Sequence, residues 1–353
     1  MIGLRASLSL LPPHRRDEAG GLRPHPPAQR FAAVFVAVAA TVALAACGGQ
    51  PGSSGAASSC QPKPRSLVIA TGNPTGVYAA LGGKLADLIS ANTPLQARAV
   101  PTGSTLRNVQ QLSTGEYDIA FAQADSAADA VLGQGVFAEP QKIQALARIY
   151  SDYTHVIVST GSGITTMADF RGKRISTGSP QSGTELIADR LLRAAGLDPK
   201  RDVSAQSLDL GAAAAAIKAG SIDGFVWSGG LPTGGVADLF ASSGDQLRFV
   251  DVSGLLPAMQ KDDQVYTAGT IPAAVYHTPA DVPTIALPNM LVVREDFPDD
   301  VACAVTKVLF EKKNDLVATN AAAKELDPKR AADTGPIKLN GGARTALDQL
   351  SAG

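Results

Sequence analysis

Cysteine, histidine and aromatic residues are scarce in this chain of 353 residues, and neither sign of charge dominates. Three cysteines cannot cross-link a disulfide scaffold. The four histidines form no H-E-x-x-H motif, and neither Cys-x-x-Cys nor a G-x-S-x-G elbow is present. A net charge of −1, without a basic stripe, argues against a nucleic-acid partner. We therefore expect no cofactor, no metal and no enzymatic activity.

Long apolar runs are also missing, except near the beginning of the chain. Phe31 to Ala46 is apolar and follows five arginines, but it is shorter than the roughly 20 residues that span a bilayer. We expect residues 1–46 to be a signal peptide. The run ends in Leu44-Ala45-Ala46-Cys47, which resembles the lipobox of bacterial lipoproteins and implies lipidation of Cys47. The alternative is an ordinary secretory signal with an incidental cysteine.

Residues 47–65 are rich in Gly, Ser and Pro, which predicts a flexible tether that cannot bury a core. A folded body is expected to begin at residue 66. If Cys47 is lipidated, Cys60 and Cys303 remain, and they either form one structural disulfide or stay free.

Beyond residue 65, short β-branched runs alternate with helical stretches, which is typical of an α/β fold with a mostly parallel sheet. Two extended runs, at residues 147–160 and 282–295, are unusually long and bracket an α/β block. They predict two crossings between two lobes that surround a ligand cleft. We assign residues 66–155 to lobe 1, residues 156–283 to lobe 2, and residues 284–353 to the hinge return and the rest of lobe 1.

One unit recurs in both lobes: a helix, a Gly-x-x-Asp turn and a buried strand, at Gly115–Asp118 and at Gly220–Asp223. The Gly is expected to end the helix, and the Asp to cap the turn into the strand. Polar or aromatic residues follow each strand, namely Gln123, Asp125 and Ser126 in the first copy and Trp227, Pro232 and Thr233 in the second. Ligands bind beyond the carboxyl ends of such strands, so the two sets would face each other across the cleft.

The stretch ATGNPTGVYAALGG, residues 70–83, predicts a strand end, a Gly/Pro turn and an amphipathic helix. It lacks the Lys and Ser/Thr that follow the last Gly of a P-loop, and the dinucleotide fingerprint is absent. We infer a site in which the helix N-terminus holds a carboxylate, surrounded by Gly72, Thr75, Gly76 and Tyr78. Alternatively, the glycines only close a tight turn and Tyr78 belongs to the core.

The stretch TGSPQSGTE, residues 177–185, has the same design at the start of another predicted helix. Its candidate site residues are Ser179, Ser182, Gly183 and Thr184, and the alternative is an ordinary N-cap supported by Glu185.

The two strand ends supply further candidates. Asp125, next to the candidate Gln123, either accepts a hydrogen bond from a ligand ammonium or caps the helix that follows. Trp227, the only tryptophan, either lines the cleft together with Gly230 and Thr233 or belongs to the core.

Five motifs resemble, in order, those of the TAXI family of TRAP transporter solute-binding proteins. They are ATGNPTGVYAALGGKLA, VPTGSTLRNVQQLSTGEYDIAFAQADSA, GSPQSGTELIADRLL, AIKAGSIDGFVWSGGLPT and AGTIPAAVYHTPADVPTIALPNMLVV. The resemblance covers residues 67–319, with departures at Asn73-Pro74 and Ala274. It implies a type II periplasmic-binding-protein fold and a small carboxylate solute, an amino acid or a dicarboxylate such as glutamate. It also implies delivery of that solute to a TRAP permease.

We accordingly expect a monomeric, lipid-anchored, extracytoplasmic solute-binding protein. One alternative is a sensor whose closed form engages a signalling receptor. The other is a periplasmic enzyme on the same scaffold, which the missing acid/base constellation disfavours.

Overall fold

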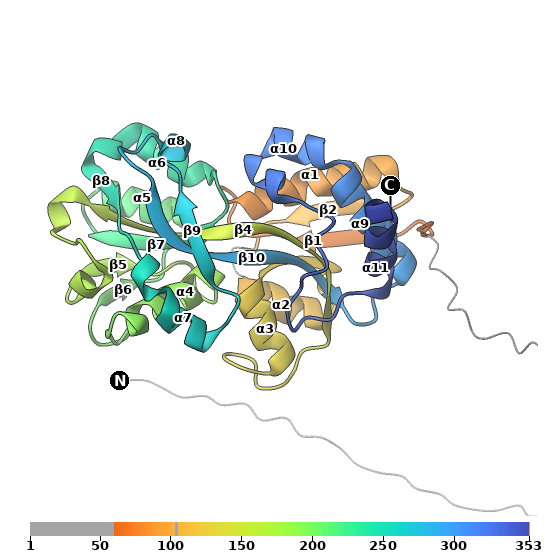
Figure 1. The fold of residues 1–353 in the computed structure, drawn as a ribbon, viewed down its shortest axis with the longest axis horizontal. Coiled ribbons are helices and arrows are strands. Elements are labelled where there is room, and N and C mark those ends of the chain that lie inside the picture. Colours follow the sequence, from red (N-terminus) through yellow and green to blue (C-terminus); the bar gives the residue numbers. More distant parts are fainter. Residues whose placement is uncertain (1–59, 103–104, 353) are drawn as a thin grey trace, which may run out of the picture. The chain divides into compact units, whose positions relative to one another are not determined.

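Two α/β lobes make up the part of the chain that the computed structural model describes, residues 60–102 and 105–352 (Figure 1). The predicted signal peptide, Cys47 and most of the predicted tether lie outside these residues. Lobe 1 contains the parallel strands β1 (Ser66–Ala70), β2 (Gln96–Val100) and β3 (Ile119–Gln123). Its helices are α1 (Val77–Asn92), α2 (Thr105–Ser113), α3 (Ala124–Leu132), α9 (Asp299–Glu311), α10 (Lys313–Thr319) and α11 (Gly341–Ala352).

Lobe 2 is also built of strands and helices. Its strands are β5 (Arg174–Ser176), β6 (Ser204–Gln206), β7 (Gly224–Gly229), β8 (Leu247–Phe249) and β9 (Thr267–Ile271). Its helices are α4 (Gly183–Ala194), α5 (Leu210–Lys218), α6 (Gly234–Ser243), α7 (Leu256–Asp262) and α8 (Ala273–Tyr276).

Two long antiparallel strands, β4 (Ile143–Ser159) and β10 (Val282–Arg294), belong to both lobes (Figure 1). In lobe 1, β10 pairs with β3 through residues 289–293; in lobe 2, β4 pairs with β7 through residues 153–158. The resulting sheet has the order β2-β1-β3-β10-β4-β7-β5-β6, with β8 added to β4 and β9 to β10. The two lobes are therefore joined by two crossing strands.

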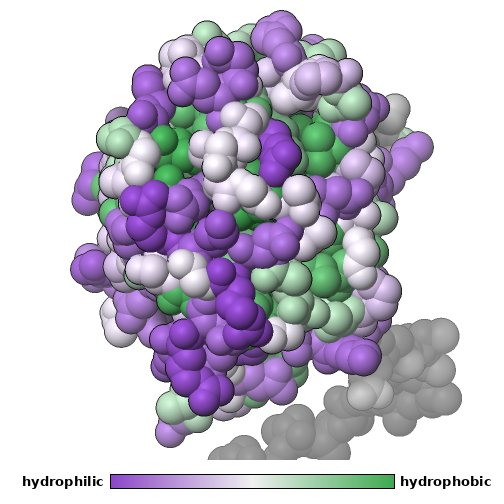
Figure 2. Space-filling model, turned by 90° about the vertical axis from the view of Figure 1, so that its left-hand side faces the viewer, coloured by the Kyte–Doolittle hydropathy of each residue, from purple (hydrophilic) through white to green (hydrophobic). Residues whose placement is uncertain are grey.

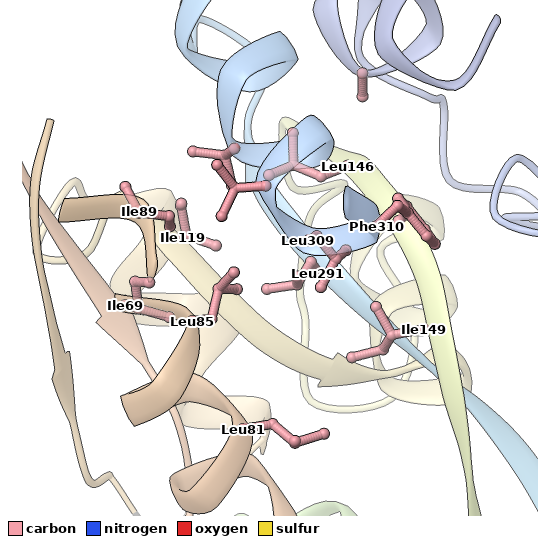
Figure 3. Packing of buried hydrophobic residues seen from close by; sticks show 14 of the residues in the cluster. Ile69, Leu81, Leu85, Ile89, Ile119, Leu146, Ile149, Leu291, Leu309 and Phe310 are labelled. Atoms are coloured by element: carbon pink, nitrogen blue, oxygen red, sulfur yellow. The ribbon is translucent and has the colours of Figure 1, made fainter. Parts of the chain in front are cut away.

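The central strands bury both faces, because helices cover each side of the sheet. In β3, Ile119 and Phe121 pack with α1 and α9, whereas the alternate residues Ala120 and Ala122 pack with α2 and α3. Figure 3 shows the first of these clusters, in which side chains of α1 meet those of β1, β3 and α9. Each fully buried Leu or Ile stabilises the fold by about 1.5 to 3 kcal/mol.

The same alternation continues along β4 into lobe 2. Val156 and Val158 pack against α4, and Ile157 packs on the opposite face against α5 and α6. One strand therefore contributes to the cores of both lobes.

The repeated turns differ from the prediction in one respect. Gly115 and Gly220 end their helices in the left-handed region, as expected (φ 83° and 69°). Asp118, however, accepts a hydrogen bond from the N–H of Val68, and Asp223 accepts one from the N–H of Arg174, both at 2.8 Å. Each carboxylate therefore binds the amide of a neighbouring strand, one residue before the β1–β3 or β5–β7 ladder begins. It does not cap the turn that contains it.

Cys60 and Cys303 form a disulfide, which decides between the two alternatives for these cysteines. It ties the segment before β1 to α9, across a sequence separation of 243 residues. On the lobe 2 side of the molecule, hydrophilic residues cover most of the surface and hydrophobic ones show as separate areas (Figure 2). Within the described ranges, no helix has the length and apolar character needed to cross a bilayer.

Candidate functional site

A cavity of about 50 Å³ lies between the lobes, where the carboxyl ends of β1, β3 and β7 approach each other. It has room for only a few water-sized groups. Lobe 1 and the crossing strand β4 contribute Thr71, Gly72, Asn73, Gly76, Val77, Tyr78, Thr105, Gln123, Tyr150 and Asp152. Lobe 2 contributes Ser179, Ser182, Gly183, Thr184, Trp227, Ser228 and Gly229.

Nine of the thirteen predicted ligand-binding residues line this cavity. They are Gly72, Gly76, Tyr78, Gln123, Ser179, Ser182, Gly183, Thr184 and Trp227. The other four, Thr75, Asp125, Gly230 and Thr233, lie outside the lining, and each has a different structural role described below.

The N-terminus of α1 enters the site without a side-chain cap. Gly76 is the N-cap residue, and no side chain bonds the amides of the first turn. Thr75 is exposed, and its hydroxyl donates to Asn73 Oδ1 at 2.9 Å. Its carbonyl accepts from the N–H of Gly235 in α6, so Thr75 contacts lobe 2 outside the cavity. The first-turn amides, rather than the Thr75 hydroxyl, are what this stretch offers to a ligand.

The N-terminus of α4 enters from the opposite lobe. Ser182 is its N-cap and accepts from the N–H of Glu185 at 3.0 Å, so the capping alternative holds for this residue although it also lines the cavity. Thr184 Oγ1 accepts from the N–H of Ser228 at 3.2 Å and joins α4 to β7. Two helix N-termini, one from each lobe, thus face the same cavity.

Gln123 reaches across from lobe 1 to lobe 2. Its Nε2 donates to Ser228 Oγ and to Asp152 Oδ2, both at 2.8 Å. The observed conformation of Gln123 requires glycine at position 183, because a Cβ there would lie 1.5 Å from the Gln123 Oε1 and displace the side chain. Gly183 therefore allows the two lobes to approach each other.

Aromatic side chains form the remaining wall. Tyr78 donates from its hydroxyl to Asn289 Oδ1, and its ring lies edge-on to Tyr150, with centroids 6.4 Å apart. Trp227 packs over Gly76 of the other lobe, where a Cβ would lie 3.5 Å from its ring. Burial raises the pKa of Tyr78 and of Tyr150 well above 10, so both hydroxyls stay protonated.

Thr233 and Gly230 position Trp227 and do not touch the cavity. Trp227 Nε1 donates to Thr233 Oγ1 at 3.2 Å, and that hydroxyl donates to the carbonyl of Gly230 at 2.8 Å.

Asp125 joins the lobes at a separate place. Its Oδ2 lies 3.0 Å from Arg190 Nη1 of α4 and accepts from the hydroxyl of Tyr266 at 2.6 Å. Arg190 also pairs with Asp129, at 3.0 Å. These four residues, the α3–α4 ion cluster, are buried. Asp125 therefore pairs with an arginine of lobe 2. Asp125 does not line the cavity.

The sequence interpretation missed Asp152 and Tyr150, which lie two residues apart on β4. Asp152 is 3% exposed, and burial raises its pKa to about 7, an effect that the amides of Gln123 and Asn289 partly oppose. A signal was present, because Asp152 is the only carboxylate in the long extended run at residues 147–160. Among the described residues, no group of three His, Cys, Asp or Glu side chains could hold a metal ion.

Among the solved structures that resemble this fold are two with the same two-lobed arrangement over most of their length. PhnD1 from Prochlorococcus marinus, in complex with methylphosphonate, is 13% identical with a TM-score of 0.51, over 82% of this chain and 98% of that chain. A protein described as a periplasmic transporter is 14% identical with a TM-score of 0.52, over 81% of this chain and 93% of that chain. These likenesses concern the fold, and they confirm the predicted periplasmic-binding-protein fold with its two α/β lobes.

The predicted TAXI family, in contrast, is wrong. Residues 69–348 match the model of the NMT1-like family, so the TRAP permease that the resemblance implied also loses its support. The small residues in these motifs, such as Gly76 and Gly183, lie at helix starts where the two lobes approach each other closely, which any two-lobed cavity requires, so they do not identify one family. Because the match spans most of the sequence, the chain belongs to the NMT1-like family.

Proposed function

We propose that this protein captures a small polar solute between its lobes and passes it to a membrane transporter. The observation that carries the proposal is a cavity lined by both lobes in which buried polar atoms, including Tyr150 Oη and Asp152 Oδ1, have no hydrogen-bond partner among the described residues. Buried polar atoms are normally paired, so these atoms are available to a bound solute.

The helix N-termini suit an anionic group on that solute. The first turn of α1 has no side-chain cap, and the start of α4 lies across the cavity from it. Amides at a helix N-terminus attract negative charge, through both their hydrogen bonds and the helix dipole. A carboxylate is one group that fits this end, and the small cavity favours a solute with few non-hydrogen atoms.

Capture by lobe closure follows from the contacts across the cavity. Gln123 with Ser228 and Gly76 with Trp227 each join one lobe to the other. A solute that contacts both lobes stabilises the closed arrangement by the difference between its contacts in the closed and open states. The proposed affinity therefore depends on closure as well as on the cavity itself.

The glycine at position 183 allows a direct test. Gly183→Ala should block the approach of Gln123 and abolish binding, while the separate lobes still fold. Gly83→Ala is the matched control, because a Cβ at that helical position meets nothing within 4 Å. The assay is native mass spectrometry of the purified protein, followed by calorimetry with the solute recovered from it. Equal binding by wild type and Gly183→Ala would refute capture between the lobes, and so would the absence of any bound or stabilising solute.

We further propose that the protein is anchored by lipid at Cys47, on the extracytoplasmic side of the cell membrane. The support is the sequence Leu44-Ala45-Ala46-Cys47 at the end of the apolar run. Expressed with its signal, the protein should partition into the detergent phase, and Cys47→Ser should prevent this. Detergent partitioning that survives Cys47→Ser would refute the anchor.

A further inference from the structure

Asp152 carries a negative charge into the cavity without a cation to balance it. Its Oδ2 accepts from Gln123 at 2.8 Å, and the side-chain amide of Asn289 lies close enough to lower its pKa, but its Oδ1 completes no hydrogen bond among the described residues. None of the ion pairs found in the described ranges includes Asp152. A carboxylate buried in this way is costly unless something positive pairs with it.

The groups around Asp152 supply no positive charge. Neutral side chains face it from four elements, namely Tyr78 of α1, Gln123 of β3, Tyr150 of β4 and Asn289 of β10. The nearby charges are Asp125 and Glu325, and both are negative. Burial removes Asp152 from water without supplying a cation, which raises its pKa, and the negative charges of Asp125 and Glu325 raise that pKa further.

Tyr150 points to the same ligand chemistry. Its hydroxyl is buried, lines the cavity and has no partner in the described structure. Tyr150 and Asp152 are two positions apart on one strand, and alternate residues share a face. This face of β4 therefore offers a carboxylate acceptor, fully charged once Asp152 is ionised, beside a hydroxyl that can accept or donate.

We propose that Asp152 accepts a hydrogen bond from a protonated nitrogen of the solute, so that the protein selects solutes with an amine over isosteric solutes without one. This inference rests on the proposed function, since it assigns one end of the same cavity. If the helix N-termini of α1 and α4 bind an anionic group at the other end, the solute would be zwitterionic. Rejection of the analogue without nitrogen would be strong, because that analogue leaves the buried carboxylate unpaired.

The test uses matched probes, namely small α-amino acids and the 2-hydroxy acids that replace only the amine. Binding is measured by thermal shift and then by calorimetry. We expect hits among the amino acids alone, with each corresponding hydroxy acid at least about tenfold weaker. A hydroxy acid that binds as well as its amino acid would overturn the inference and leave the proposed function intact. A panel without any amino-acid hit would also overturn it, and native mass spectrometry would then decide separately on solute capture.

The variant Asp152→Asn identifies the residue responsible. It keeps the size of the side chain and an oxygen for Gln123, so the fold should survive. Affinity for the amino-acid probe should fall at least about tenfold, as expected for the loss of a charge-assisted hydrogen bond. Asp348→Asn, on the exposed face of α11, makes the same change in net charge and should bind as wild type.

The pH profile separates this role from a structural one. Binding to an ammonium requires ionised Asp152, so the affinity of wild type should fall about tenfold per pH unit below pH 7. In Asp152→Asn the remaining affinity should be flat between pH 5 and pH 8, where the probe's amine stays protonated. Wild-type affinity that is flat over this range, or equal affinity in the two proteins, would overturn the assignment.

Discussion

Asp152 destabilises the solute-free protein at neutral pH, because its folded pKa of about 7 is above the ordinary value of 3.8. The folded state holds the proton more tightly, so the penalty is absent below pH 4. This destabilisation grows as the pH rises from 4 to 7 and stays constant above pH 7. Three pKa units correspond to about 4 kcal/mol as an upper limit. We expect Asp152→Asn to raise the free energy of unfolding by about 2 to 4 kcal/mol at pH 8, and by almost nothing at pH 4.

Urea unfolding at the two pH values measures this difference. Asp348→Asn again serves as the control for net charge. A gain from Asp152→Asn that is equal at both pH values would contradict the linkage. The same variant is expected to bind the amine of the solute more weakly. It would then be more stable and bind less tightly than wild type, as is common when a residue of a binding site is replaced.

His155 imposes the opposite pH dependence. Its ring lies between the carbonyl of Tyr153, 2.8 Å from Nδ1, and the hydroxyl of Tyr276, 3.0 Å from Nε2. Burial lowers the pKa of His155 to about 4, from the ordinary 6.5. The unfolded chain therefore takes up the proton first, and stability falls as the pH drops from 6.5 to 4.

His155→Gln preserves the capacity for hydrogen bonds but cannot be protonated. It should remove roughly 2 to 3 kcal/mol of acid destabilisation between pH 6.5 and pH 4. Thermal melts across that pH range measure the loss of stability. Asp152→Asn is measured in parallel, because Asp152 contributes a pH dependence of the opposite sign. The expectation fails if His155→Gln loses stability towards acid as steeply as wild type.

At the scale of elements, the α3–α4 ion cluster holds the lobes together outside the cavity. Arg190 bridges Asp125 and Asp129, and removing a partner from a buried ion pair is costly if the remaining charges stay buried. Opening the lobes lets water reach those charges. We therefore expect Arg190→Met to shift the protein towards an open state and to weaken solute binding roughly tenfold or more.

Hydrogen exchange at the facing ends of α3 and α4 reports this opening, and calorimetry with the recovered solute reports the affinity. Arg193→Met is the matched control, since Arg193 lies on the same helix with an exposed side chain and pairs with Asp189 one turn away. Arg190→Met should differ from it in both measurements. Unchanged exchange and affinity in Arg190→Met would show that the cluster does not control closure.

The elements of this fold could be predicted from local patterns, and their long-range partners could not. The helix expected from Thr75 begins at Val77, because Asn73 and Thr75 bond each other in a turn before it. Asp125 was correctly placed at a strand end, but its pairing with Arg190, 65 residues away, leaves no trace in local sequence. At Asp152 the sequence predicts only a strand, because alternation shows burial and does not show what a buried polar group faces.

For the whole molecule, the solute would contact the hinge itself. Tyr150 and Asp152 lie on β4 just before Tyr153, the residue that pairs with both β10 and β7. Opposite them the register of β10 shifts between Pro288 and Met290, and proline has no N–H to donate to the ladder. We therefore expect the crossing to bend most easily at the point where the proposed amine contact forms.

Closure should then follow solute binding and should need Gly183. Small-angle scattering of wild type is expected to show a radius of gyration that falls when the recovered solute is added, because the lobes approach each other. Gly183→Ala should keep the larger radius with and without solute, since the new Cβ would displace the Gln123 side chain from its contact with Ser228. Gly83→Ala should contract as wild type does. If calorimetry shows that a solute binds while the scattering of wild type stays unchanged, the solute enters a cavity that is already closed, and the hinge has no part in capture.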